Sequence, residues 1–563
     1  MKNLNLGKRY NLLSGETKGE RLEYNLDNLT THAVITGMTG SGKTGLGLTL
    51  IEELALQSLP VIMIDPKGDL TNSLLHFPQL RDSDFAKWTD NAKQTAQTWR
   101  TKLNESGITE DDIKRIDESV EYTIYTPGAD AGAQVSVLAS LSAPKTSWDE
   151  HADRLQQRIA GTVTALMGLV GYENVDPVHS EEHILLCNII EYLWRDGVSL
   201  TLEDLIMYVL DPPFDKLGVF SVSEFCPNRD RQNLAHKINN FLASPSFANW
   251  IEGETLDIDR ILYNKDGKPR HTVFYIAHLE EKERMFFVTL LYTAIESWMR
   301  KTKGSPGLKA AVYFDEITGY LPPISNPPSK GVILRMLKHA RAYGVGMILA
   351  SQNPVDLDYK ALSNAGTWFV GKLQTPQDRN RLVSGIEGNI GKDTLNDIIS
   401  SLDTRLFMMH NINRQLPVVF KSRWVMNYLA GPLTLDRIPD LNKMAGVEIV
   451  KQKPQEQVIV SHDCTSTVGY HYRSVSVTPQ EALAKAGLPP TKQYPYEIYK
   501  ARTAKGYKPP NYYEKRHKKF SVPHYTRSLV TDEMKHHGVL WTPYYGFIID
   551  GKFVLLPAFE KGA

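Results

Sequence analysis

The sequence predicts an α/β fold built on a mostly parallel sheet, and three observations lead to this expectation. Apolar strand signals alternate with helical patterns near the N-terminus and again after about residue 266. A glycine-rich loop stands between the first apolar strand and a helix. The stretch between the two strand-rich parts has helical periodicity. Alternating strands and helices are typical of parallel sheets with right-handed crossovers.

The first two strands flank the glycine-rich loop and its helix. Ala33–Thr36 runs directly into GMTGSGKT, and TGLGLTLIEELALQ then carries apolar residues at helical spacing. Leu59–Asp65 is an unbroken apolar run, which suits a central strand that is buried on both faces. Four later strands are expected at His271–Leu279, Ala310–Glu316, Gly346–Gln352 and Thr367–Leu373.

The changes in pattern divide the chain into five parts. Between about Phe85 and Lys265 helical periodicity replaces the strand signals, so we expect a mainly helical insertion in the sheet domain. The expected parts are an N-terminal arm (1–25), the first part of the core (26–84), the helical insertion (85–265), the second part of the core (266–435) and a small C-terminal extension (436–563).

The C-terminal extension has its own charge and composition. From Lys451 onward the chain holds 17 Lys and Arg against 9 Asp and Glu, whereas the 64 basic and 64 acidic residues of the whole chain cancel. Residues 494–519, the basic tyrosine strip, interleave tyrosines with basic residues and prolines. This composition suits either stacking on nucleic-acid bases or bracing a neighbouring subunit. Near the end, GVLWTPYYGFIIDGKFVLLP predicts a hairpin with Asp550-Gly551 at its turn.

Composition excludes several classes of protein. The chain has 563 residues and 42% hydrophobic content, so it is neither disordered nor collagen-like. Its three cysteines are too few and too scattered for a disulfide framework or a zinc site. The N-terminus has no apolar signal segment, and no run of about 18 apolar residues occurs. We therefore expect a cytoplasmic protein without a membrane partner.

The glycine-rich loop predicts nucleotide binding. Gly37–Thr44 satisfies G-x-x-x-x-G-K-[ST] after a strand and at the start of a helix, a setting that argues against a chance glycine-rich turn. Its glycines let successive amides face one anion, Lys43 would reach the β and γ phosphates, and Thr44 would offer its hydroxyl to Mg²⁺. The expected nucleotide-binding residues are Gly37, Thr39, Gly40, Ser41, Gly42, Lys43 and Thr44.

Polar residues at two later strand ends predict hydrolysis. Asp315 and Glu316 end an apolar strand; Asp315 would hold Mg²⁺ through its water shell, and Glu316 would orient and deprotonate the attacking water. Gln352, at the end of the next strand, would sense the γ-phosphate by hydrogen bonding. A solvated strand end and a polar strand cap are the structural alternatives for these positions.

The helix between these two strands carries a basic face. In SKGVILRMLKHARAYG, Arg335, Lys338 and Arg341 fall three residues apart, opposite the apolar positions. Such a face is usually solvated. The alternative is an arginine finger, supplied by Arg341 to the site of a neighbouring subunit.

Taken together, these motifs resemble the HerA/FtsK branch of P-loop NTPases, and more closely the HerA-like ATP-binding proteins of bacteria. The matching stretches span roughly 26–84 and 272–429, and they are THAVITGMTGSGKT, MIDPKGDL, VYFDEITGYLPP, LKHARAYGVGMILASQNPVDLD and LSNAGTWFVGKLQTPQDRNRL. The resemblance implies a RecA-like core that binds ATP and Mg²⁺, catalysis by Glu316, sensing by Gln352 and an Arg341 that enters the adjacent subunit of a homo-hexamer.

The sequence also departs from this family at two points. Only 36 residues precede Gly37, too few for the β-barrel that HerA translocases carry ahead of the core. Several translocases have an arginine just before the phosphate-loop strand, where this chain has Thr31 and His32, so we expect no second arginine finger.

The resemblance leaves three functions open. The first is a ring-shaped DNA translocase or helicase driven by ATP hydrolysis. The second is a HerA-like NTPase scaffold or switch that controls a partner effector such as a nuclease, for example in anti-phage defence. The third, a secretion or conjugation motor, is disfavoured because no membrane anchor is apparent.

Overall fold

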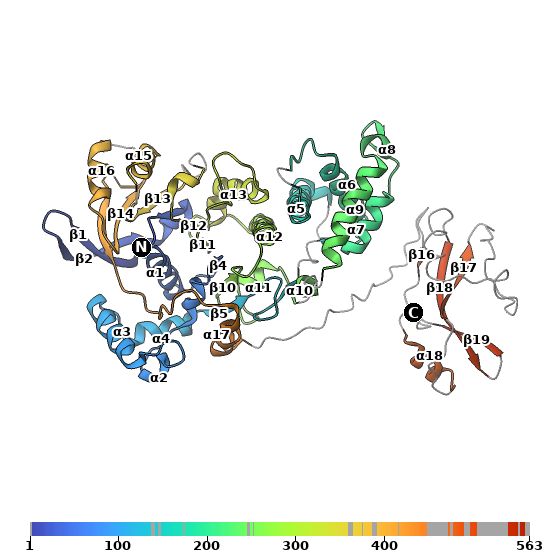
Figure 1. The fold of residues 1–563 in the computed structure, drawn as a ribbon, viewed down its shortest axis with the longest axis horizontal. Helices are drawn as coiled ribbons and strands as arrows, with labels where there is room; N and C mark the ends of the chain where they lie inside the picture. The colour runs from blue at the N-terminus through green and yellow to red at the C-terminus, as the bar shows by residue number, and fades with distance from the viewer. Residues whose placement is uncertain are drawn as a thin grey trace. The chain divides into compact units, whose positions relative to one another are not determined.

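A computed structural model gives the fold (Figure 1). It describes residues 3–136, 141–144, 148–172, 175–244, 248–251, 253–358, 364–373, 375–385, 391–414, 416–447, 471–472, 477–488, 496–503, 539–549 and 552–557. The chain forms two compact units, Met1–Pro454 and Gln455–Ala563. The larger unit holds the phosphate loop and every strand expected for the core.

One large sheet forms the centre of the larger unit. Within the described residues it has eleven strands in the order β2-β1-β15-β14-β13-β3-β12-β11-β4-β10-β5. Seven neighbouring strands of this sheet pair in parallel. In spatial order they are β13 (Thr367–Val370), β3 (Ala33–Thr36), β12 (Val345–Ser351), β11 (Ala310–Phe314), β4 (Val61–Asp65), β10 (Arg270–Tyr275) and β5 (Glu121–Tyr125). All six expected core strands are among them. The predicted α/β fold with a mostly parallel sheet is therefore confirmed.

The strand register gathers the expected site residues at one edge of this sheet. Thr36 of β3 pairs with Ser351 of β12, and Phe314 of β11 pairs with Ile64 of β4. The carboxyl ends of these four parallel strands therefore lie side by side. Ligands of open α/β sheets bind outside such strand ends.

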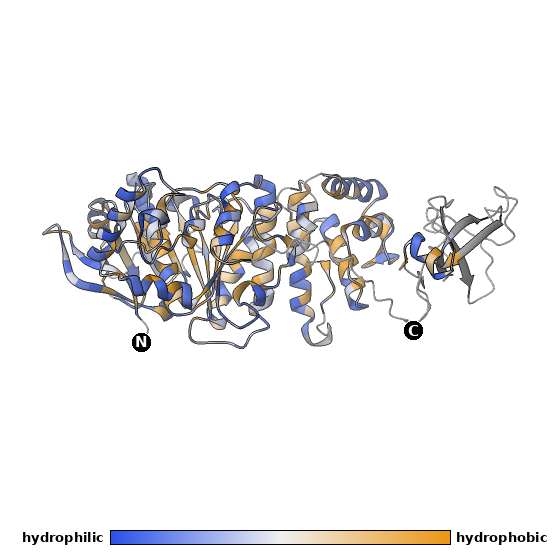
Figure 2. Cartoon of the chain, turned by 90° about the horizontal axis from the view of Figure 1, so that it is seen from below, coloured by the Kyte–Doolittle hydropathy of each residue, from blue (hydrophilic) through white to orange (hydrophobic). Residues whose placement is uncertain are grey.

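Helices cover both faces of the sheet. On β4, Ile62 and Ile64 join one hydrophobic cluster, while Val61 and Met63 join a second cluster on the opposite face. The first cluster includes residues of α5 (Trp148–Leu169), α6 (Glu181–Arg195), α12 (Glu281–Met299) and α13 (Pro328–His339); the second includes residues of α1 (Lys43–Leu56), α3 (Ala92–Ser106) and α4 (Glu110–Ser119). Figure 2 shows hydrophobic residues concentrated on the strands and the helix surfaces that meet them. The core strands are thus buried on both faces, as the apolar run of β4 predicts.

Four antiparallel strands extend the sheet beyond β13. The segment expected as an N-terminal arm forms β1 (Asn3–Asn11) and β2 (Glu16–Asn25), which pair with each other. β1 also pairs with β15 (Val418–Ser422), which follows β14 (Leu406–Asn411). β2 is the outermost strand, and most of its side chains are exposed.

The segment 85–265 is mainly helical but supplies one strand, β5, to the large sheet. Asn442 of α17 (Ile438–Met444) covers the outer edge of β5. Its side-chain Oδ1 accepts from the backbone N of Ile124, and its Nδ2 donates to the backbone O of Ile124, both at 2.9 Å. α17 thus packs with the core, beyond the boundary expected at 436. The other elements of the larger unit are α2 (Asp82–Phe85), β6 (Val135–Ser136), α7 (Leu202–Leu210), β7 (Lys216–Leu217), β8 (Phe220–Ser221), α8 (Val222–Phe225), α9 (Asn228–Leu242), α10 (Ala248–Ile251), β9 (Glu254–Thr255), α11 (Ile258–Leu262), α15 (Pro376–Gly385), α16 (Lys392–Ser400) and several short 3-10 helices.

The smaller unit contains a second sheet. Its described elements are β16 (His471–Tyr472), α18 (Pro479–Lys485), β17 (Tyr496–Thr503), β18 (Val539–Ile549) and β19 (Lys552–Pro557). β18 and β19 are antiparallel, with Ile549 opposite Lys552, so the expected hairpin is present, although Asp550 and Gly551 lie outside the described residues. Most of the basic tyrosine strip also lies outside them. No helix in the described parts of either unit is long and apolar enough to span a bilayer.

Candidate functional site

The phosphate loop connects β3 to α1 at the carboxyl edge of the sheet. Met38 N donates to Lys372 O just beyond β13 (2.7 Å), and Ser41 N donates back to Met38 O (3.1 Å). Gly40 (φ +80°) and Gly42 (φ +96°) have left-handed backbones, which glycine adopts without steric cost. The loop therefore curls at its glycines and opens directly into the first turn of α1.

Lys43 folds against its own loop. Its Nζ donates to Gly37 O (2.5 Å) and to Met38 O (3.3 Å), and the residue is only 8% exposed. Burial lowers the pKa of Lys43, and the nearby carboxylates of Glu316 and Asp315 act in the opposite direction. The loop thus holds a cation where the motif places the nucleotide phosphates.

The loop fits a nucleotide with its magnesium ion. The Ser41 hydroxyl is buried and has no hydrogen-bond partner among the described residues, so it can bond to a bound phosphate. No atom lies within 4 Å of the position that a side chain at Gly40 would occupy, which leaves that side of the loop open. The N-terminus of α1 adds partial positive charge, and Thr44 stands in its first turn with the hydroxyl that Mg²⁺ takes in such loops.

Asp315 lies buried at the end of β11. It is 5% exposed, and Tyr313 donates its hydroxyl to Asp315 Oδ1 (3.4 Å). Burial, together with repulsion from Asp65 and Asp69, raises the pKa of Asp315 to about 7. A nearby divalent cation favours the ionised form of a carboxylate. Asp315 therefore fits the role of holding Mg²⁺ through its water shell.

Glu316 is held in an uncommon backbone conformation, with φ at +57°. Its Oε1 accepts from Thr318 Oγ1 (2.6 Å) and from Gln352 N (3.2 Å), and its Oε2 accepts from Lys67 Nζ (3.0 Å). Burial acts to raise the pKa of Glu316, but the Thr318 and Lys67 donors outweigh it and the pKa is lowered. Glu316 is therefore an oriented, ionised carboxylate.

Gln352 links the phosphate loop to the acidic strand end. Thr39 Oγ1 donates to Gln352 Oε1 (3.1 Å), while the backbone N of Gln352 donates to Glu316. The structure therefore brings Lys43, Asp315, Glu316 and Gln352 to one edge of the sheet, from three different strand ends.

Two further residues, Asp65 and Lys67, lie at this edge, and no sequence pattern predicts a role for them. Both carboxylate oxygens of Asp65 are occupied by backbone amides, namely those of Lys67, Gly68, Asp69, Leu70 and Thr71 at 2.7 to 3.2 Å. Burial raises the pKa of Asp65 to about 6, yet five amide donors favour its anion. The sequence signal for this turn was MIDPKGDL, in which a strand-end aspartate precedes Pro-Lys-Gly-Asp.

Arg341 lies at the amino-terminal ends of the parallel strands, whereas the phosphate loop lies at their carboxyl ends. It belongs to a 3-10 turn (Ala340–Tyr343) just before β12, whereas the phosphate loop follows β3, which runs parallel to β12. The seven residues of β12 span about 20 Å between the two edges. Arg341 is exposed and cannot reach the phosphate loop of its own chain.

Arg335 does not share the solvated face expected for it. Its guanidinium bonds to both carboxylate oxygens of Glu296 on α12 at 2.9 to 3.2 Å, and the Glu296 side chain is only 5% exposed. Arg335 therefore fastens α13 to α12, while Lys338 and Arg341 stay exposed.

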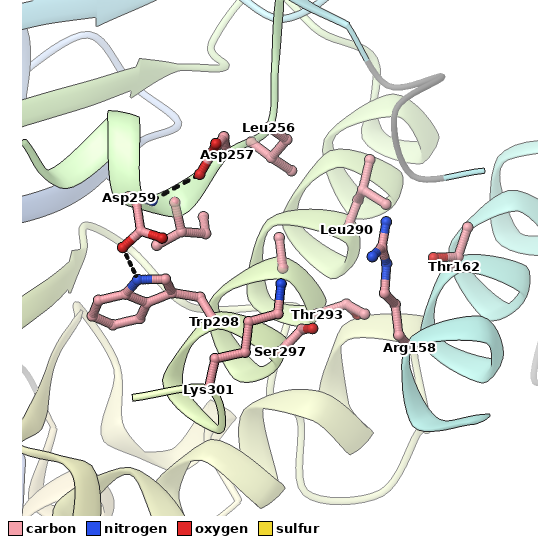
Figure 3. Close-up of a pocket in the computed structure, with 12 residues that line it drawn as sticks. Arg158, Thr162, Leu256, Asp257, Asp259, Leu290, Thr293, Ser297, Trp298 and Lys301 are labelled. Carbon is pink, nitrogen blue, oxygen red and sulfur yellow. Dashed lines mark hydrogen bonds between the residues drawn. The ribbon is translucent and has the colours of Figure 1, made fainter. Parts of the chain in front are cut away.

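A cavity of about 260 Å³ lies between α5, α11 and α12 (Figure 3). Lys301 and Arg158 border it, and burial followed by repulsion from Arg158 lowers the pKa of Lys301. Asp259 accepts from Trp298 Nε1 (2.6 Å), and Asp257 accepts from the backbone N of Asp259 (3.1 Å). The lining residues include none from the phosphate loop or the acidic strand end.

Comparisons with known proteins give one family-model match to part of the chain and several structural likenesses. Residues 14–119, which contain the phosphate loop and Asp65–Lys67, match the family model DUF87, described as the central domain of helicase HerA. No curated protein matches the sequence. VirB4 of Thermoanaerobacter pseudethanolicus aligns at 13% identity over 75% of this chain and 96% of its own, with a TM-score of 0.46.

Plasmid coupling protein TrwB with an ATP analogue that cannot be hydrolysed aligns at 12% identity over 77% of this chain and 97% of its own, with a TM-score of 0.48. The genome-packaging NTPase B204 from Sulfolobus turreted icosahedral virus 2 aligns at 18% identity over 27% of this chain and 69% of its own, with a TM-score of 0.21. The family match confirms, for the phosphate-loop part of the chain, the resemblance to HerA.

Proposed function

We propose that this chain is a P-loop ATPase of the HerA/FtsK type that uses ATP and Mg²⁺ and works as a ring-forming DNA translocase or helicase. The match of residues 14–119 to the HerA central-domain model supports this proposal. One observation carries the ring. The phosphate loop lies at the carboxyl ends of the parallel strands and Arg341 at their amino-terminal ends. A site that contains both groups must therefore be formed by two copies of the chain. Contacts of this head-to-tail kind close into rings when the rotation permits, and we propose a homo-hexamer.

Within each site we propose the following roles. The loop amides, the Ser41 hydroxyl and Lys43 bind and orient the phosphates, and Thr44 and Asp315 hold Mg²⁺, which neutralises phosphate charge when bound. Glu316 accepts the proton of the attacking water, because its carboxylate is ionised and fixed by Thr318 and Gln352.

We propose that Gln352 and Arg341 complete the site. Gln352 senses the terminal phosphate, since it touches both Thr39 and Glu316. Arg341 of one subunit stabilises the charge that develops in the site of the next.

The proposal is tested by the ATPase rate with and without double-stranded DNA, on protein whose mass has been measured in the same buffer. A translocase ring should show a mass of several chains and a rate that DNA stimulates. Glu316→Gln gives the background ATPase rate of the assay, because its amide keeps the shape of the glutamate side chain but cannot accept a proton from water. If the protein is an oligomer and DNA does not change its ATPase rate, the result would instead favour a scaffold or switch that controls a partner such as an effector nuclease.

Mixing two inactive variants tests the shared site. Arg341→Ala should still bind nucleotide but lose hydrolysis, and so should Glu316→Gln. In a random mixture, about a quarter of the interfaces combine an intact Glu316 with an intact Arg341 from the neighbour, so activity should partly return. Arg229→Ala, an exposed arginine on α9, is the matched control and should stay active. A fully active monomer would contradict the ring.

A further inference from the structure

Lys67 forms an ion pair with the carboxylate expected to act as the general base. Its Nζ lies 3.0 Å from Glu316 Oε2, and the two side chains are 36% and 17% exposed. The two residues come from neighbouring strand ends, since β4 precedes Lys67 and β11 precedes Glu316. The contact therefore follows directly from the order of strands in the sheet.

The ion pair occupies one particular oxygen of Glu316. Thr318 and Gln352 both donate to Oε1. Within the described part of the chain, Lys67 is the one donor to Oε2. Oε1 is thus used to position the carboxylate, and Oε2, the oxygen left to take a proton from water, is covered by Lys67.

The backbone of Lys67 is fixed, whereas its side chain is partly exposed. The amides of Lys67 and its four following residues bond to the buried carboxylate of Asp65, which anchors the turn. A lysine side chain has four rotatable bonds and can exchange one anionic partner for another. Any change of partner at Lys67 is therefore a movement of the side chain on a rigid turn.

The charge of Lys67 also acts on the phosphate-binding lysine. Repulsion from Lys67 contributes, after burial, to the lowered pKa of Lys43, and its charge opposes the raised pKa of Asp315. Lys67 thus stands within electrostatic reach of both the phosphate loop and the magnesium-binding carboxylate. Lys67 lies outside the phosphate-loop motif, to which Lys43 belongs.

We propose that Lys67 is a nucleotide-dependent latch on Glu316. Without nucleotide it pairs with Oε2 and blocks the base. With a nucleoside triphosphate in the loop, Lys67 exchanges Glu316 for the terminal phosphate, and Oε2 becomes free to accept a proton from water. A diphosphate lacks the γ-phosphate, so the latch stays closed. This inference rests on the ATPase activity and does not depend on DNA.

The latch is tested by nucleotide binding rather than by turnover. Dissociation constants are measured with fluorescent ATPγS and ADP for the wild type and for Lys67→Met, which keeps the length but removes the charge. Loss of a charge-assisted bond should weaken ATPγS binding about tenfold and change ADP binding by less than about twofold. Lys372→Met is the matched control, because Lys372 borders the loop and pairs with exposed Asp403 at 3.2 Å. The ratio of its ATPγS and ADP dissociation constants should stay at the wild-type value.

A second variant separates a latch from a merely structural ion pair. In Glu316→Gln the lysine loses its anionic partner, so ATPγS should bind more tightly than in the wild type, and the added Lys67→Met substitution should abolish that gain. Equal weakening of both nucleotides by Lys67→Met, or an unchanged ratio, would overturn the latch. Failure of the wild type to bind or hydrolyse ATP would instead overturn the ATPase assignment.

Discussion

Arg423 offers a sharp test of how the phosphate-loop helix is held in place. Arg423 directly follows β15. Its guanidinium contacts Glu52 Oε2 (2.7 Å) and Glu53 Oε1 (3.0 Å), both on α1. The three side chains are 2%, 3% and 7% exposed. Arg423 Nε also donates to Asn5 O of β1 (2.9 Å). One buried arginine therefore joins α1 to two antiparallel strands of the sheet.

Arg423→Met should lower the free energy of unfolding by about 3–5 kcal/mol, because it leaves two buried carboxylates without their cation. The lower end of this range is expected, since other donors remain. Glu52 Oε1 still accepts from the backbone N of Met426 (2.7 Å), and Glu53 Oε2 from that of Asn5 (2.8 Å). Arg437→Met is the matched control: its pair with Asp436 spans 3.7 Å with side chains 45% and 74% exposed, and should contribute less than about 1 kcal/mol.

Urea unfolding followed by tryptophan fluorescence measures both variants, and Trp424 lies next to the substituted residue. Replacing Glu52 and Glu53 by Gln in the Arg423→Met background should recover part of the loss, because the unpaired charges are removed. Equal unfolding midpoints for Arg423→Met and Arg437→Met would refute the reasoning.

Three further outcomes are expected. Lys43→Ala should lose nucleotide binding, measured by fluorescence titration, because the loop's own cation is removed; unchanged turnover would contradict the site. His32 donates to Leu337 O and accepts from Met347 N, both at 3.1 Å, and burial lowers its pKa to about 4. Only the unfolded chain takes up this proton below about pH 6.5, so stability should fall by up to about 1.4 kcal/mol per pH unit down to about pH 4. His32→Gln should flatten that slope in urea titrations at several pH values, and parallel slopes would argue against it. A chain ending at Pro454 should keep the basal ATPase, since the site lies in the larger unit; a lower salt dependence of DNA binding would show that the basic tyrosine strip binds DNA, and a lower mass that it braces the ring.

The parallel core could be predicted because its signals are local. Each core strand is a short apolar run with a turn or motif at its end, and the phosphate loop combines its motif with a strand and a helix. The outer strands lack such signals. β2 reads ETKGERLEYN and exposes most of its side chains, so it has no alternating apolar pattern. β5 is five residues long within a helical stretch, and only its partner β10 reveals its place.

The site was predictable where one motif carries it and obscure where two distant segments meet. Lys67 and Glu316 are 249 positions apart, and they touch because β4 and β11 are neighbours in the sheet. The same holds for Arg335, whose helical periodicity predicts a solvated face although Glu296 on α12 binds it. Periodicity identifies which face a residue occupies but not which neighbour covers that face.

The two outer strands of the large sheet, β2 and β5, are protected in different ways. At one end β2 presents exposed charges, including Lys18, Glu20, Arg21 and Glu23, and at the other the Asn442 amide satisfies both backbone groups of Ile124. Unpaired strand edges are the places where sheets recruit foreign strands and aggregate, and charge or cover prevents this. A sheet protected at both ends does not grow by adding strands. Copies of this chain that assemble should therefore meet through helices and loops rather than by adding strands to this sheet.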